Sequence, residues 1–161
     1  MRTKTIPKIR KMKRADAEVV AEMMAALAAY HGHETRIGAA EFVARGLGSK
    51  KLTTIWIATV DREPAGFAAT FDWMNFVRAF RVRHIDLLFV SERFRGQGVG
   101  TALVANILKD ANASGCLRAT VGVANENGEA REFYRKLGFQ QRRDDSLRFQ
   151  YEILDDSRVF A

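Results

Sequence analysis

The sequence predicts an α/β protein with a mixed sheet, and three observations support this. The 161 residues are 47% hydrophobic and contain neither a Gly/Ser-rich linker nor a repeat, which suits one domain over residues 1–161. Short β-branched or alternating runs are interspersed with segments of helical periodicity. A glycine-rich segment in mid-chain joins an apolar run to an amphipathic one. The predicted order of elements is β-α-α-β-β-β-α-β-α-β-β.

The first three elements are a strand and two helices. Basic residues flank a strand expected at Ile6–Met12. Asp16 is a suitable N-cap for a helix that runs to about Tyr30, because the apolar residues that follow recur at helical spacing. A second, short helix is expected at Ala39–Leu47, where Gly48 can end it.

Three strands precede the glycine-rich segment, and further elements follow it. The β-branched run Thr53–Val60 ends in a turn, and strands are expected next at Ala65–Met74 and Phe80–Val90. The remaining elements are a helix at Thr101–Ala113, a strand at Leu117–Val123, a helix at Gly128–Leu137, and strands at Phe139–Arg142 and Leu147–Leu154.

Composition and charge narrow the classes of partner. The net charge of +7 favours anionic partners, which include nucleic acid, membranes and a phosphate-rich cofactor. Cys116 is the single cysteine, so an intramolecular disulfide is excluded and a buried thiol is expected. The three histidines lack metal-ligand spacing, so no metal is expected. With no signal-peptide core and no apolar stretch long enough for a bilayer, the expectation is a cytoplasmic protein without a membrane partner.

The segment Val90–Thr101, V-S-E-R-F-R-G-Q-G-V-G-T, carries the most chemical information. Its glycines let backbone N–H groups approach an anion, and the helix start adds the positive end of a dipole. Arg95 adds a cation suited to phosphate oxygens. The spacing fits neither a Walker A loop nor a Rossmann fingerprint. The segment therefore predicts a diphosphate cradle, with a ligand-free strand-to-helix turn as the alternative.

Two motifs resemble those of a known family. Arg95-x-x-Gly98-x-Gly100 is similar to the R/Q-x-x-G-x-G/A signature for acetyl-CoA in the GNAT superfamily of N-acetyltransferases. Residues Asn127–Phe139 resemble its second motif, N-x-x-A-x-x-F-Y-x-K-L-G-F. The resemblance runs from about Ile9 to Ile153. It implies the GNAT fold, a mostly antiparallel mixed sheet with splayed central strands, and acetyl transfer from acetyl-CoA to an amine.

The resemblance also implies a role for individual residues. The strands on either side of the first cofactor helix splay apart in this family, and the pantetheine arm lies between them. Leu88 and Val90 would bond to the arm through their main chain, and Asn127 would bond to it from the other side. Tyr134 would donate a proton to the departing thiolate. The diphosphate would be held by the amides of Arg95, Gly96, Gln97, Gly98, Val99, Gly100 and Thr101.

The acceptor amine must lose a proton before it can attack the thioester. An amine with a pKa of about 10 is only about one-thousandth neutral at pH 7. Asp86 stands where many GNAT relatives have a glutamate base, and strand alternation predicts that Asp86, Leu88 and Val90 share one face. The alternative for Asp86 is an ion pair with Arg81 or Arg83.

The sequence leaves the acceptor and the partners open. It is loosely similar to the diamine and polyamine acetyltransferase branch, with a possible acidic site from Glu34, Asp72 and Asp86. The alternatives are a peptide or protein amine, an acyl-CoA-binding module, and a nucleic-acid binder that uses its basic runs. Nucleic acid is not the expected partner, because no aromatic RNA-binding motif accompanies those runs. A homodimer is expected, with Phe71–Val77 as a contact or a substrate wall.

Overall fold

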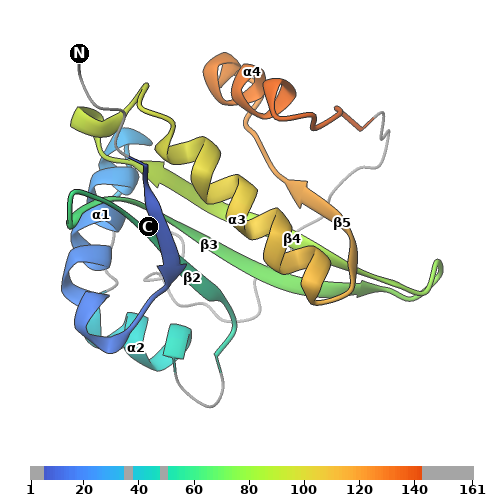
Figure 1. Cartoon of the computed structure of the whole chain (residues 1–161), viewed down its shortest axis with the longest axis horizontal. Coiled ribbons are helices and arrows are strands. Elements are labelled where there is room, and N and C mark those ends of the chain that lie inside the picture. Colours follow the sequence, from blue (N-terminus) through green and yellow to red (C-terminus); the bar gives the residue numbers. More distant parts are fainter. Residues whose placement is uncertain (1–5, 35–37, 48–50, 143–161) are drawn as a thin grey trace. The chain divides into compact units, whose positions relative to one another are not determined.

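The computed structural model of the chain describes residues 6–34, 38–47 and 51–142 (Figure 1). Residues up to Ala124 form one compact unit and residues from Asn125 form a second. The strands of the first unit are β1 Lys8–Lys11, β2 Thr54–Val60, β3 Glu63–Asn75, β4 Phe80–Val90 and β5 Cys116–Val121. Its helices are α1 Ala17–Tyr30, α2 Ala39–Leu47 and α3 Val99–Ala113, with short 3-10 turns η1 Arg14–Asp16 and η2 Glu92–Phe94.

The five strands form one sheet in the order β1-β2-β3-β4-β5. Neighbouring strands are antiparallel except β4 and β5, which are parallel. This confirms the predicted mixed, mostly antiparallel sheet. The helix after the glycine-rich segment begins at Val99 rather than at Thr101, because Gly98 adopts left-handed backbone angles at the N-cap and the helix starts inside that segment.

Helices cover both faces of the sheet. On one face, Val20, Met23 and Leu27 of α1 pack in a core cluster with side chains of β2, β3 and β4. The β2 members of that cluster are Ile55 and Ile57, so Trp56, the residue between them in the strand, points to the opposite face. α3 lies against the sheet (Figure 1) and contacts all five strands. It buries Leu103, Val104 and Ile107. The N-terminal end of α3 therefore lies against the sheet near the end of β4.

The structure corrects the predicted role of Asp16. Asp16 is the N-cap residue of α1, but its side chain makes no capping hydrogen bond. Its carboxylate instead accepts two hydrogen bonds from the Arg10 guanidinium, at 2.6 and 2.8 Å, and one from the Lys13 amide at 2.7 Å. The bidentate pair with the guanidinium engages both carboxylate oxygens and turns the side chain toward β1, away from the first amides of α1.

β4 and β5 diverge at the point where the glycine-rich segment approaches. Their pairing ends at Ile85 and Val121, whereas β4 stays paired with β3 as far as Val90. The edge of β4 that faces β5 is therefore unpaired over its last residues. A β-bulge lies at the same point, because Thr70 pairs with Ile85 and Ala69 with Leu87.

The second unit contains α4, Gly128–Lys136. Its N-cap is Asn127, whose side-chain oxygen accepts a hydrogen bond from the Ala130 amide at 3.0 Å. The predicted strand at Phe139–Arg142 is wrong for the described residues, which are irregular there. Its expected hairpin partner, Leu147–Leu154, lies outside the described residues.

Candidate active site

The glycine loop between β4 and α3 has space in front of its backbone. Gly96 and Gly98 adopt φ angles of 72° and 82°, in the left-handed region that suits glycine. A Cβ atom built on either residue would have no other atom within 4 Å. Backbone groups at these positions can therefore be approached closely by a ligand, as a diphosphate requires.

The first turn of α3 supplies hydrogen-bond donors toward that space. The first helical bond runs from the Ala102 amide to the Gly98 carbonyl, at 2.9 Å. The amides of Val99, Gly100 and Thr101 thus have no acceptor within the helix, and the helix dipole is positive there. The geometry fits the diphosphate of a nucleotide cofactor.

Arg95 can offer an anion its side chain but not its amide. The Arg95 amide donates to the Glu92 carbonyl at 3.1 Å, so it is used within η2. The Arg95 Nε atom donates to the Val90 carbonyl at 3.2 Å, and the guanidinium carbon lies 5.7 Å from the centre of the Tyr30 ring. The cation is held beside the loop by groups from β4 and α1.

Leu88 and Val90 lie on the unpaired part of β4. They pair with Ala68 and Gly66 of β3 on one side and have no β5 partner on the other. Their main chain can therefore bond to an extended ligand in the manner of an added strand. Gly66 was not singled out from the sequence. A Cβ at this position would collide with the Phe89 carbonyl, so glycine allows β3 to pair closely with the last residues of β4.

Asp86 sits in the bulge of β4. Because the bulge places one extra residue in β4, the shared face predicted for Asp86, Leu88 and Val90 cannot be derived from regular alternation and stays a prediction. Asp86 is exposed and makes no ion pair with another described residue. The ion-pair alternative fails, since Arg83 binds other carboxylates and Arg81 donates to the Ser114 carbonyl.

A buried ion-pair network on the α3 side went unpredicted. Arg83, 5% exposed, binds Asp72 of β3 and also Asp110 of α3, the latter at 3.0 Å. Lys11 binds the same Asp110 at 3.0 Å. Asp72 is therefore committed to Arg83, which removes it from the predicted acidic amine site. The network also neutralises Lys11 and Arg83, two of the cations that a nucleic-acid binder would use.

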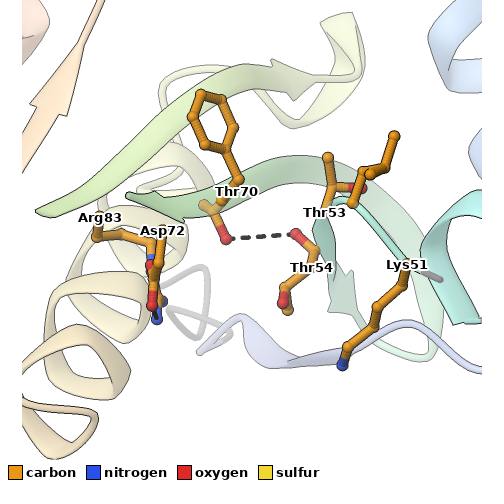
Figure 2. Close-up of a pocket in the computed structure, with 8 residues that line it drawn as sticks. Lys51, Thr53, Thr54, Thr70, Asp72 and Arg83 are labelled. Atoms are coloured by element: carbon orange, nitrogen blue, oxygen red, sulfur yellow. Dashed lines mark hydrogen bonds and ion pairs between the residues drawn. The ribbon is translucent and has the colours of Figure 1, made fainter. Parts of the chain in front are cut away.

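A pocket of about 170 Å³ lies beside this network, lined by Lys51–Thr54, Thr70–Asp72 and Arg83 (Figure 2). The Thr70 hydroxyl donates to the Thr54 carbonyl at 3.3 Å across its wall. Arg83 lies roughly 20 Å along β4 from Val90. This pocket is thus separate from the glycine loop and contains none of the residues predicted to bind the cofactor or to act as base or acid; Phe71 and Asp72, predicted on the acceptor side, line its wall.

Asn127 and Tyr134 lie in the second unit. The Asn127 side-chain oxygen caps α4, which leaves its amide nitrogen as the group that could bond to a ligand. Tyr134 is buried, with its ring centre 5.0 Å from that of Phe133 and 5.4 Å from that of Phe139. Burial raises the pKa of Tyr134 to about 12. The phenol is therefore protonated at neutral pH.

Two further predictions concern side chains outside the loop. Cys116 is buried, as predicted, and burial together with the nearby Asp72 raises the pKa of its thiol. Such a thiol is a poor nucleophile at neutral pH. Within residues 6–34, 38–47 and 51–142, no cluster of three or more His, Cys, Asp or Glu side chains could hold a metal ion. The same residues contain no helix of the length and hydrophobicity that crossing a membrane requires.

Comparison with known proteins identifies the family. The profile of the acetyltransferase (GNAT) family matches residues 33–139, which include β4, the glycine loop, α3 and α4. The chain belongs to this family. It is 34% identical over 88 residues to an uncharacterized N-acetyltransferase of Methanocaldococcus jannaschii, covering 54% of this chain and 39% of that protein. It is 33% identical over 87 residues to the peptidyl-lysine N-acetyltransferase YjaB of Salmonella typhimurium, covering 53% and 50%. The chain thus matches half or less of the length of these two GNAT relatives.

Solved structures share the GNAT fold. A probable acetyltransferase superposes with a TM-score of 0.77 at 19% identity, over 92% of this chain and 99% of the other. An aminoglycoside acetyltransferase from a soil metagenomic sample, in complex with sisomicin, superposes with a TM-score of 0.75 at 15% identity, over 92% and 97%. At such identities the likeness concerns the fold, and it agrees with the predicted GNAT architecture.

Proposed function

We propose that this GNAT chain is an acetyl-CoA-dependent N-acetyltransferase that transfers the acetyl group directly to a primary amine. The observation that carries the proposal is the position of the glycine loop, which starts α3 immediately after the unpaired edge of β4. A diphosphate and an extended arm need these two features next to each other. Family membership supports the same acyl donor.

The residues of the loop and strand would divide the binding of acetyl-CoA between them. The helix-start amides and the Arg95 side chain would hold the diphosphate, and the main chain of Leu88 and Val90 would hold the arm. Acetyl-CoA supplies the thioester whose acyl carbon the amine attacks. The chain itself must orient the amine, accept its proton and stabilise the sulfur that departs.

Asp86 is proposed to act on the acceptor amine, either as its base or as its anchor. Its position at the bulge puts a carboxylate where β4 parts from β5, beside the strand edge proposed to bind the arm. A carboxylate there can accept the amine proton, directly or through a water, or attract a cationic amine by its charge. These two roles differ in their pH dependence, so kinetics can separate them.

Tyr134 is proposed to serve the leaving sulfur. Its phenol stays protonated at neutral pH because burial raises its pKa to about 12, so it can donate a hydrogen bond. A free alkyl thiol has a pKa of about 8.5. Complete transfer of a proton from such a phenol to the thiolate is therefore uphill. The hydrogen bond should therefore strengthen as negative charge develops on the sulfur, which is the behaviour that lowers a barrier.

The acceptor is proposed to be a small primary amine, with a diamine favoured and a peptide or protein amine as the alternative. Asp86 and Glu34 are exposed carboxylates that favour a cationic acceptor. One similar protein is named a peptidyl-lysine N-acetyltransferase and another an aminoglycoside acetyltransferase. The relatives thus support both classes of acceptor.

A screen for CoA release over diamines, aminoglycosides, amino acids and peptides tests this function, with Gly98→Val as the control. Amine-dependent release by the wild type and not by the control is expected. If acetyl-CoA and CoA at millimolar concentration leave the melting temperature unchanged, the cofactor assignment fails. A thermal shift without turnover on any amine would favour an acyl-CoA-binding module. Salt-sensitive RNA or DNA binding in place of both would favour the nucleic-acid binder.

We also propose that the chain forms a homodimer through the β3–β4 hairpin. The hairpin reaches past the end of α3 (Figure 1), and its tip carries Phe76, 85% exposed, and Val77, 96% exposed. Trp73 and Met74 lie exposed beside them, so apolar side chains cluster on a protruding element. Light scattering should give about twice the 18.1 kDa chain mass. Phe76→Ser should lower that mass. Leu52→Ser, a substitution at another exposed apolar residue, is the control and should not lower it. A wild-type mass near 18.1 kDa at all concentrations would contradict the dimer.

A further inference from the structure

Tyr30, at the C-terminal end of α1, makes an unpredicted contact with the glycine loop. The guanidinium carbon of Arg95 lies over the Tyr30 ring, 5.7 Å from its centre, within the range of a cation–π interaction. His31 packs edge-on against the same ring, with centroids 5.3 Å apart and planes 82° from parallel. The end of α1 also carries the negative pole of the helix dipole, which favours a cation there.

The contact leaves the anion-binding atoms of Arg95 available. The Nε atom donates to the Val90 carbonyl, while the two terminal nitrogens have no partner among the described residues. A cation–π contact with a ring does not use up the N–H donors of a guanidinium, which remain able to bind an anion. Tyr30 and the Val90 carbonyl thus hold Arg95 through the ring contact and the Nε atom, and the terminal donors remain for a ligand at the loop.

Holding a long side chain in place before a ligand binds reduces the entropy lost on binding. Arg95 is exposed, so without a support its guanidinium would sample many rotamers. We propose that Tyr30 is a positioning residue that holds the Arg95 guanidinium for the diphosphate of CoA. This inference rests on the proposed function, since it concerns how the same cofactor is bound.

The test compares a donor that has the diphosphate with one that lacks it. Tyr30→Ala should raise the Kd and KM of acetyl-CoA roughly two- to fivefold, because an exposed cation–π contact of this kind is lost. The KM of S-acetylpantetheine, which has no diphosphate, should not change. Tyr30→Phe keeps the ring and should bind acetyl-CoA like the wild type. In an Arg95→Ala background, Tyr30→Ala should have no further effect.

Each contrary result has a distinct meaning. An equal loss with both donors, or a full effect of Tyr30→Ala in the Arg95→Ala background, would overturn the inference, since Tyr30 would then act without Arg95. Wild-type affinity for acetyl-CoA in Tyr30→Ala would overturn it as well. In these cases the wild type still binds acetyl-CoA and the proposed function stands. A wild type that binds no acetyl-CoA removes the proposed function, and with it the role of Tyr30.

Discussion

The Arg83 guanidinium donates a hydrogen bond to Asp110 Oδ2 at 3.0 Å, which ties the middle of β4 to the C-terminal half of α3. Both elements carry predicted cofactor residues at their other ends, Leu88 and Val90 on β4 and Val99 to Thr101 on α3. Lys11 of β1 binds the second oxygen of Asp110 at 3.0 Å. The Arg83–Asp110 pair therefore fixes α3 against β4 on the side away from the glycine loop.

Asp110→Asn should destabilise the protein by about 2 kcal/mol, because it leaves the buried Arg83 with one carboxylate fewer. Chemical denaturation monitored by circular dichroism measures this change. Glu132→Gln is the matched control, since Glu132 pairs with Arg135 on the surface of α4 and such pairs contribute little. Equal effects of the two substitutions would show that the network around Arg83 adds no stability.

Acid stability should follow the same carboxylate. Burial alone would raise the pKa of Asp110, but hydrogen bonds and charges from Arg83 and Lys11 outweigh it and the pKa is lowered. A lowered pKa stabilises the folded state above the unfolded value of about 3.9, and this stabilisation is lost as pH falls through the folded value. The free energy of unfolding should thus fall less steeply below pH 4 in Asp110→Asn than in the wild type. Parallel curves for the two proteins would contradict this.

Gly98→Val should abolish the rise in melting temperature that acetyl-CoA produces, because a side chain would occupy the open space in front of the loop. Its backbone strain costs about 1 kcal/mol in the ligand-free protein. Gly115→Val is the matched control, since Gly115 also has a positive φ, 77°, and open space at its Cβ, but follows the other end of α3. If both variants keep the thermal shift, the loop is only a turn.

Tyr134→Phe should lower kcat by about a hundred- to ten-thousandfold where chemistry limits turnover. Acetyl-CoA binding should change little, because the ring and its packing remain. With a pKa of about 12, Tyr134 itself should cause no loss of activity up to about pH 10. Tyr30→Phe removes a phenol elsewhere and controls for the substitution. Full activity of Tyr134→Phe would remove the tyrosine from the mechanism.

Asp86→Asn separates the two roles proposed for this carboxylate. If Asp86 accepts the amine proton, kcat should fall at neutral pH, and the loss should shrink at high pH, where the amine deprotonates without help. If Asp86 anchors a cationic amine, the KM of the amine should rise and high pH should not restore it. Steady-state kinetics from pH 6 to 10 distinguish these outcomes. Glu92→Gln, at an exposed carboxylate in η2, is the control, and an Asp86→Asn enzyme that matches it throughout would exclude both roles.

The sequence alone determined the element order of the first unit, the mixed sheet and the glycine loop. These features are local: periodicity depends on side chains a few residues apart, and the left-handed glycines of the loop, Gly96 and Gly98, are separated by a single residue. The splayed strands followed from the family resemblance, and the unpaired end of β4 confirms them. Asp16 shows the limit of helix-capping rules, because Arg10 of the preceding strand binds the carboxylate that a helix cap would have used.

Only the tertiary structure decided which charges are free and which residues meet. Arg83, Asp72 and Asp110 lie on three different elements, so their pairing depends on strand register and helix placement. The bulge at Asp86 results from the register between β3 and β4, which no periodicity within one strand encodes. The contact between Tyr30 and Arg95 also depends on tertiary packing. α1 packs on the sheet through its apolar face, and that packing brings Tyr30, its last residue, to the loop.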